Sequence, residues 1–251
     1  MPRSTSSSSV SPPAALASLS KRVRQLSWTQ LETDLNHQGF AQIKGFFDKR
    51  EASQIKRRYD DPARRFRKTV NMHQHQFGAG EYKYFANPLP AEVAQLRRAF
   101  YKQLAPLANQ WSAWLKQDLH WPQTLSAFTR QCHAAGQSRP TPLLLHYKTG
   151  GFNRLHQDMY GEVFFPFQVV FLLDQPQTDF TGGEFLLVEN SPRRQARSHV
   201  IPLALGDALI FPVRERPEPG KHRMRRCQMR HGVSTVHSGT RTTLGLIFHD
   251  A

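Results

Sequence analysis

The chain has 251 residues, 39% of them hydrophobic, which is enough for one substantial domain with a full core. It holds only two cysteines, Cys132 and Cys227, so neither a disulfide framework nor a cysteine-based zinc site is expected. No apolar run approaches the ~20 residues that a membrane-spanning helix needs. The formal net charge of +15 favours a polyanionic partner such as nucleic acid, although it is also compatible with a generally basic protein kept soluble by its charges. A reducing, cytoplasmic location is the simplest expectation, and the sequence carries no signal for an oligomeric state.

The segment from 1 to 20 is rich in serine and proline and contains no acidic residue. It shows no hydrophobic periodicity, which predicts a disordered tail. Such a composition is also typical of an organelle transit peptide. We favour the plain tail because nothing else in the chain requires a targeting address.

Residues 21–142 are expected to form a helical support region at the start of a single domain that spans 21–251. Helices are predicted from about Trp28 to Gly39, from Asp48 to about Tyr59, over Pro90–Gln117 and over 122–135, with strands at 40–47 and two short strands within 64–86. Thr29 with Glu32 is expected to form a capping-box pair, and Asp48 with Glu51 is expected to form a second cap. Pro106 predicts a kink or break near 103–105 in the longest helix.

From Leu143 to the C-terminus the pattern changes to closely spaced strands, rich in apolar, β-branched and aromatic residues and separated by Gly, Pro and Asp. Antiparallel strands without intervening helices predict a double-stranded β-helix, or jelly roll. The expected fold is therefore mainly β with flanking helices (α+β), with the jelly-roll core in 143–251 and the helical region ahead of it.

His156-Gln157-Asp158 is the first motif that carries chemistry. Residues at i and i+2 of an extended segment point to the same face, so one metal ion can bind both side chains, and His231 can approach from another strand. Two histidines and one carboxylate form the facial triad typical of non-haem Fe(II) oxygenases. His237 and His249 are weaker candidates for the third ligand, and a surface ion pair or a core histidine is the structural alternative for each residue taken singly.

Arg241 lies ten positions after His231, beyond an expected hairpin turn at Ser238-Gly239. A 2-oxoglutarate molecule that chelates the metal through its keto-acid end needs a cation for its distal carboxylate, and Arg241 supplies one. Thr243 lies on the same face of the strand and offers a hydroxyl donor. Two further donors are candidates, the Tyr147 hydroxyl from a neighbouring strand and the Asn153 amide. For Asn153, a loop amide that caps its own backbone is an equal alternative.

At these residues the chain resembles the 2-oxoglutarate/Fe(II)-dependent dioxygenase superfamily. Thr181-Gly182-Gly183-Glu184-Phe185 resembles the superfamily's Gly-Gly-Glu turn, and PLALGDALIF (202–211) its Gly-Asp turn into a core strand. More closely, the segments FPFQVVFLLDQP, DFTGGEFLLVEN, RHGVS and LGLIFHDA resemble a bacterial oxygenase family described as acting oxidatively on damaged DNA. The resemblance implies Fe(II) as cofactor, 2-oxoglutarate and O2 as co-substrates, and 143–251 as the catalytic half.

For the substrate, the expectation is oxidative demethylation of alkylated DNA. Tyr82, Tyr84 and Tyr160 are candidates for stacking on a base, with core packing as the alternative. Arg223, Arg225 and Arg226 belong to a basic cluster on a Pro/Gly-interrupted loop that runs directly into His231, so they are expected near the mouth of the site. A prolyl-hydroxylase-like or small-molecule hydroxylase is the alternative enzyme. A nucleic-acid-binding jelly-roll protein without turnover is the alternative outside enzymes.

Overall fold

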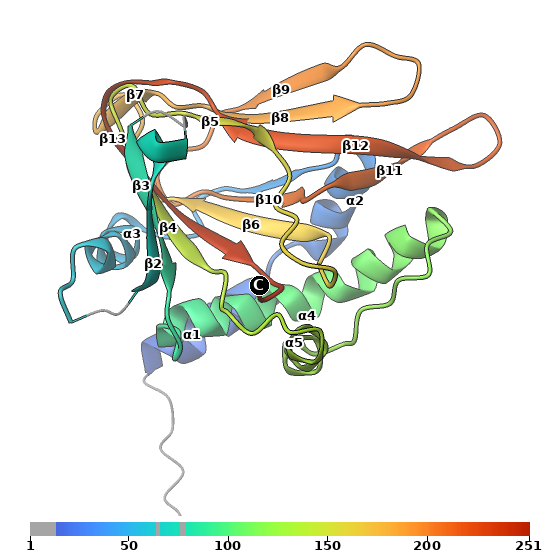
Figure 1. Cartoon of the computed structure of the whole chain (residues 1–251), viewed down its shortest axis with the longest axis horizontal. Coiled ribbons are helices and arrows are strands. Elements are labelled where there is room, and N and C mark those ends of the chain that lie inside the picture. Colours follow the sequence, from blue (N-terminus) through green and yellow to red (C-terminus); the bar gives the residue numbers. More distant parts are fainter. Residues whose placement is uncertain (1–13, 64–65, 76–78) are drawn as a thin grey trace, which may run out of the picture.

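The computed structural model describes residues 14–63, 66–75 and 79–251. Two antiparallel sheets face each other, and helices cover the outer face of the larger sheet (Figure 1). This arrangement is the jelly roll with flanking helices that the sequence predicts. The described residues contain no helix that is both long and apolar enough to cross a membrane.

The larger sheet joins strands from both ends of the chain. In spatial order it contains β1 (Ala41–Ile43), β10 (Ala208–Pro212), β6 (Phe167–Leu172), β13 (Val236–Ile247), β4 (Leu143–Lys148), β3 (Gly80–Phe85) and β2 (Phe66–Asn71), with β7 (Phe180–Gly182) paired to β13. The two strands expected within 64–86 are therefore present as β2 and β3, and they extend the sheet beyond β4.

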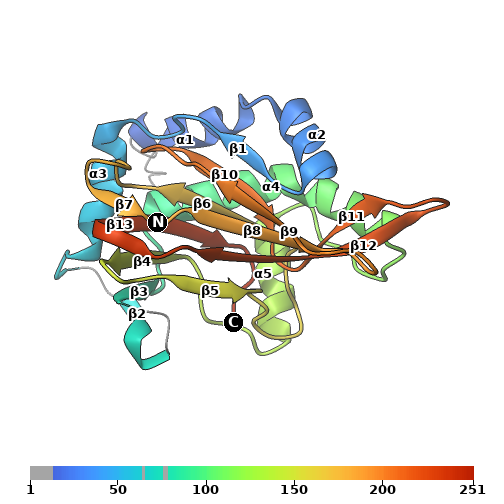
Figure 2. The same ribbon diagram turned by 90° about the horizontal axis from the view of Figure 1, so that it is seen from above.

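The smaller sheet contains β11 (Glu215–Pro219), β12 (Met224–Val233), β8 (Phe185–Asn190) and β9 (Arg197–Ile201), with β5 (Asn153–His156) also paired to β12. The β8–β9 and β11–β12 hairpins project together beyond the larger sheet (Figures 1 and 2). The basic cluster that precedes His231 in the sequence therefore lies on a hairpin, not on an irregular loop.

Every residue of β6 is buried, because both faces of this strand are covered. Phe167, Val169 and Phe171 pack into the core shared with the helices. Val170 and Leu172 face the other way and pack into a second core between the two sheets. Burial of each such side chain stabilises the fold by roughly 1.5–3 kcal/mol, so the two apolar layers fix the spacing of the sheets.

The helices are α1 (Ala14–Arg24), α2 (Trp28–Gln38), α3 (Lys49–Lys56), α4 (Ala91–Trp114) and α5 (Leu125–Ala134), with short 3-10 turns at Arg57–Tyr59 and Met72–His75. The second predicted cap is a full capping box at α3, where Asp48 and Glu51 each accept a hydrogen bond from the other's backbone N–H. The capping box predicted for Thr29 and Glu32 is wrong, because α2 has Ser27 as its N-cap and no side-chain cap hydrogen bond. Helix α4 is continuous through Pro106, so the helix does not break near 103–105.

The predicted boundary of the N-terminal tail at residue 20 is wrong. Helix α1 begins at Ala14, and Leu19 and Val23 are buried in the core against the rest of the domain. These two residues are four positions apart and so share one helix face. The apolar stretch was too short to indicate a helix by itself, and packing against α4 supplies the missing stability. The rest of the predicted tail, 1–13, lies outside the described residues.

The turn expected at Ser238-Gly239 is also wrong, because Ser234 and Thr235 connect β12 to β13. Gly239 lies inside β13 with φ +74°, at an irregular pairing with β7. A Cβ at this position would lie 2.0 Å from the Asp179 carbonyl oxygen, so glycine is required by a close backbone approach. Glycine in a strand marks such irregularities as readily as it marks turns.

Candidate active site

His156, Asp158 and His231 come together between the two sheets. His231 on β12 is the direct antiparallel partner of His156 on β5, and Asp158 follows β5 by two residues. Asp158 Oδ1 lies 3.3 Å from His156 Nε2, and Asp158 Oδ2 lies 3.3 Å from His231 Nε2. Their potential ligand atoms all lie within 4.8 Å of one another, which is the only such group of three among the described residues.

The donor atoms of this group suit a divalent cation. The Nδ1 of His156 lies 2.7 Å from the Arg154 carbonyl oxygen, so Nδ1 carries a proton and Nε2 is the nitrogen that faces Asp158. Burial opposes ionisation of Asp158, but hydrogen bonds from the two histidines hold its pKa well below the usual value. Burial, and then the charge of His156, lower the pKa of His231. A carboxylate and two imidazole nitrogens are thus presented together.

Two residues hold the carboxylate of Asp158 from outside this group. The Tyr160 hydroxyl donates to Asp158 Oδ1 at 2.8 Å, and Gln168 Nε2 donates to Asp158 Oδ2 at 2.7 Å. Tyr160 was expected only as a stacking residue, and Gln168 was not expected at all. The signal for Gln168 was present in the sequence, since it is the one polar side chain in the buried strand β6.

A cavity of about 340 Å³ opens from these residues along the space between the sheets. Arg241, Thr243, Gly245 and Ile247 line it from alternate positions of β13, and Tyr147 of β4 is the direct partner of Arg241. Asn153 lines the opposite wall, and its Nδ2 donates to the Tyr147 hydroxyl at 3.5 Å. The expected co-substrate residues therefore share one cavity with the candidate metal ligands.

Arg241 is 2% exposed, yet its Nε has no hydrogen-bond partner and no carboxylate of the described residues forms an ion pair with it. Burial lowers its pKa, and the rings of Tyr147 and Phe180 lie 5.6 and 6.0 Å from the guanidinium carbon. A buried cation without a counter-ion is costly and is retained where an anionic ligand completes it. The cavity is therefore suited to a ligand that carries a carboxylate.

The other half of the cavity is apolar and aromatic. Tyr82 and Tyr84 lie on alternate positions of β3 and line it together with Tyr160 and Met72. The Tyr84 hydroxyl donates to that of Tyr160 at 3.4 Å, which links the aromatic wall to Asp158. Burial raises the pKa of Tyr84 to about 12, so this hydroxyl stays protonated at neutral pH. These side chains form a surface against which a flat group can lie.

Other candidates lie outside the cavity. His237 is exposed on β13, and His249 is buried but is not part of the ligand group. Arg223, Arg225 and Arg226 line the projecting hairpin, eight, six and five residues before His231. An extended strand rises about 3.3 Å per residue, so they lie roughly 17–26 Å from His231 along the chain. Arg225 is paired with Glu218, whereas Arg226 points to the opposite face.

Comparison with known proteins identifies relatives of this chain. Residues 80–251 match the model of a family described as "Oxygenase, catalysing oxidative methylation of damaged DNA". Two Mycobacterium tuberculosis proteins, from strains CDC 1551 and H37Rv and both named as uncharacterized, are 47% identical over 167 residues, which is 66% of this chain and 72% of each of theirs.

Solved structures show the same fold at low sequence identity. A Trichoplax adhaerens prolyl hydroxylase, in complex with a hypoxia inducible factor peptide, is 12% identical with a TM-score of 0.54, and the match covers 93% of both chains. An oxidoreductase of the 2OG-Fe(II) oxygenase family from Burkholderia pseudomallei is 16% identical with a TM-score of 0.51, covering 90% of this chain and 94% of that one. The fold is thus that of 2-oxoglutarate/Fe(II) oxygenases, and on the family match the chain belongs to the oxygenase family described as catalysing oxidative methylation of damaged DNA.

Proposed function

We propose that this oxygenase is a 2-oxoglutarate- and Fe(II)-dependent dioxygenase that oxidises an alkyl group on a nucleobase of DNA. One observation carries the reaction class. A single cavity holds a two-histidine, one-carboxylate group and, on the neighbouring sheet, a buried guanidinium that forms no ion pair with the described residues. A ligand that is both a metal chelator and a dicarboxylate satisfies both halves at once.

His156, Asp158 and His231 would hold Fe(II), a metal that this donor set suits and that would keep open positions on its other face. Arg241 would bind the distal carboxylate of 2-oxoglutarate through charge-assisted hydrogen bonds, with Thr243, Tyr147 and Asn153 as further donors. When bound, the metal and 2-oxoglutarate supply the activation of O2, with release of succinate and CO2 as a C–H bond is hydroxylated. Tyr160 and Gln168 hold the carboxylate of Asp158 in place.

Three features support a nucleobase as substrate. The tyrosines of the aromatic wall can stack on the flat face of a base taken out of a duplex. The chain carries a net charge of +15, and the family description refers to damaged DNA. Hydroxylation of an N-methyl carbon gives a hemiaminal that loses formaldehyde unaided, so the cavity needs no additional acid or base. Arg223, Arg225 and Arg226 would contact the polyanion outside the cavity.

The reaction class can be tested without knowing the substrate. Purified protein loaded with Fe(II) in the absence of oxygen should gain a visible charge-transfer absorption when 2-oxoglutarate is added. His156→Ala, Asp158→Ala and His231→Ala should each lose this absorption. Wild-type protein that gains no absorption would refute the proposal, because chelation of the metal by the keto acid is its central requirement.

The substrate class requires a second test. Methylated oligonucleotides should yield formaldehyde and succinate in equal amounts, and Tyr82→Ala and Tyr84→Ala should reduce this turnover while leaving the charge-transfer absorption intact. Succinate release driven by a proline-containing peptide or a free amino acid, with no formaldehyde from oligonucleotides, would replace the nucleobase by a hydroxylase substrate. The iron and 2-oxoglutarate assignments would then still stand.

A further inference from the structure

A second pocket, of about 450 Å³, lies on the smaller sheet away from the catalytic cavity. The end of α2 and the two projecting hairpins surround it, and none of the residues that line it lines the catalytic cavity. Its charged walls are formed by Glu189, Arg194, Arg197, Arg216 and Glu218, and His37 of α2 also lines it. The pocket is continuous with the catalytic strands, since Glu189 lies two residues beyond Leu187, the direct partner of His231.

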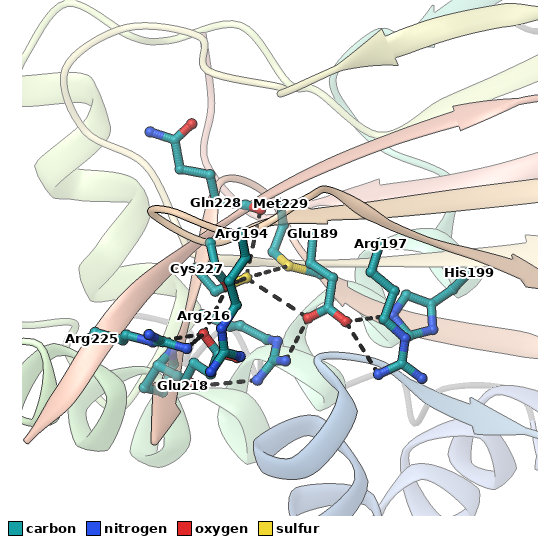
Figure 3. A network of polar contacts seen from close by, with 12 residues as sticks. Glu189, Arg194, Arg197, His199, Arg216, Glu218, Arg225, Cys227, Gln228 and Met229 are labelled. Carbon is teal, nitrogen blue, oxygen red and sulfur yellow. Dashed lines mark hydrogen bonds and ion pairs between the residues drawn. The ribbon is translucent and has the colours of Figure 1, made fainter. Parts of the chain in front are cut away.

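The two carboxylates in this pocket are already neutralised from within the protein (Figure 3). Glu189 accepts hydrogen bonds from Arg216 at 2.5 Å and from His199 at 2.8 Å, and Glu218 accepts one from Arg225 at 2.9 Å. Burial opposes ionisation of Glu189, but its hydrogen bonds with Arg216 and His199 keep its pKa below the usual value. Both carboxylates are thus paired before any ligand is present.

Two further arginines, Arg194 and Arg197, lie beside the same two carboxylates. Their side chains are 61% and 75% exposed. Arg194 also donates a hydrogen bond to Glu218 at 3.2 Å, and Arg197 lies 3.8 Å from Glu189, so each is an additional cation beside a carboxylate that already has an arginine partner. The network therefore contains four guanidinium groups and two carboxylates, which leaves two positive charges in the network, and three of its four arginines line the pocket: Arg194, Arg197 and Arg216 (Figure 3). Arginine presents a planar fork of donors that matches the oxygens of a phosphoryl group.

Arg216 adds a buried donor to this wall. The residue is 5% exposed and lines the pocket, and its buried Nε has no hydrogen-bond partner in the part of the chain that the structure describes. Its position depends on Gly39 at the end of α2, because a Cβ there would lie 2.6 Å from Arg216 Cδ. A buried N–H of a charged group is costly to leave unpaired, so an anionic ligand that reaches it would be favoured.

The surroundings of the pocket favour a polyanion over a single small anion. Arg193 is exposed in the turn of the β8–β9 hairpin, and Lys221 and Arg223 are exposed in the turn of the β11–β12 hairpin. The two hairpins project side by side (Figures 1 and 2), so these cations extend the positive surface outward from the pocket. A chain of phosphates can occupy both the pocket and the hairpin tips.

We propose that this pocket binds a phosphodiester of the nucleic-acid backbone, several nucleotides from the base that enters the catalytic cavity. Arg194, Arg197 and the Nε of Arg216 contact the phosphoryl oxygens, while Glu189 and Glu218 orient the arginines. The inference rests on the nucleic-acid part of the proposed function. It assigns to the hairpins the task of holding the backbone, independently of any modified base.

The test uses the full chain and an unmodified, fluorescently labelled oligothymidylate, which carries phosphates but no alkylated base. Binding is followed by fluorescence anisotropy over a series of salt concentrations. The double variant Arg194→Gln/Arg197→Gln should bind at least about tenfold more weakly, and the slope of log affinity against log salt should fall by roughly 1.4, because about 0.7 is lost for each single-strand phosphate contact. Arg216→Lys, which keeps the charge but removes the Nε donor, should also weaken binding.

The matched control is Arg98→Gln/Lys102→Gln, which removes the same two charges from exposed positions on α4. This variant should bind oligothymidylate like the wild type. An equal loss of affinity in both double variants would indicate a nonspecific charge effect and overturn the site. In a second control, inorganic phosphate is titrated into the complex with oligothymidylate. Displacement of the oligothymidylate by inorganic phosphate would likewise overturn the backbone assignment in favour of a free phosphoryl ligand.

The outcome is separable from that of the proposed reaction. If methylated oligonucleotides give formaldehyde but the double variant binds oligothymidylate like the wild type, the phosphate site fails and the reaction stands. If the double variant loses binding but no formaldehyde forms from any methylated oligonucleotide, the site stands and the substrate assignment fails.

Discussion

Replacing Arg241 by methionine should have opposite effects on ligand binding and on stability. Among the described residues the guanidinium is 2% exposed, its Nε is unpaired and it forms no ion pair, so the ligand-free fold carries a buried charge that only more distant carboxylates offset. Arg241→Met keeps much of the side-chain volume and removes that charge, and replacement of a buried ion by an apolar residue is often neutral or stabilising. The melting temperature should therefore stay the same or rise.

The same change removes the partner of the 2-oxoglutarate carboxylate. Loss of one member of a buried, hydrogen-bonded charge pair costs about 2–5 kcal/mol, which is a loss of affinity of roughly thirtyfold to several thousandfold. Titration of 2-oxoglutarate into the Fe(II) protein without oxygen, followed by the charge-transfer absorption, measures this directly. Arg230→Met, an exposed arginine on β12, is the control. An unchanged half-saturation concentration in Arg241→Met would show that another cation binds the distal carboxylate.

Three further predictions concern the ligands, the acid stability and the partner. His231→Ala should lose Fe(II)-dependent absorption with little change in melting temperature, whereas His237→Ala should retain it, and the reverse result would reassign the third ligand. His249 is buried with a pKa of about 4 against 6.5 when free, so above pH 6.5 both states are neutral, and below it the unfolded state alone gains a proton. Urea unfolding should show about 3 kcal/mol of stability lost between those two pH values, at about 1.4 kcal/mol per pH unit, and a loss that is equally steep in His249→Gln would contradict this origin. The third prediction concerns the hairpin arginines Arg223, Arg225 and Arg226. Replacing all three by glutamine should lower the slope of log DNA affinity against log salt concentration by about 2, and an unchanged slope would place the polyanion elsewhere.

The local part of the candidate site could be predicted from the sequence. The spacing of His156 and Asp158 fixes their common face by backbone geometry alone. Arg241 and Tyr147 lie side by side because β13 pairs with β4, and the prediction required only that these two strands be neighbours. The position of Arg241 survived a wrong turn assignment, because strand periodicity decides which residues face the cavity and the turn at Ser234-Thr235 preserves that alternation.

The contacts that depend on register across the sheets could not be predicted. Gln168 reaches Asp158 only because β6 pairs with β13 so that Gln168 faces the cavity, while Phe167 faces the helices. No pattern within the strand distinguishes this register from one shifted by a residue, apart from the polar side chain itself. The second pocket is harder still, since its walls come from α2, β8–β9 and β11, which are far apart in the sequence.

Sequence proximity also misplaced the basic cluster. Because the arginines directly precede His231, they were expected at the mouth of the catalytic cavity, but β12 is extended and carries them away from it. Alternation along β12 further divides them: Arg225 shares the inner face with Cys227, Met229 and His231, while Arg226 faces outward. One strand therefore presents a candidate metal ligand at one end and, six residues or roughly 20 Å away, Arg225, which pairs with Glu218 of the proposed phosphate pocket. In the proposed function, the rise of this β-strand would set the distance between the base and the bound backbone, and side-chain substitutions in the hairpin do not change that rise.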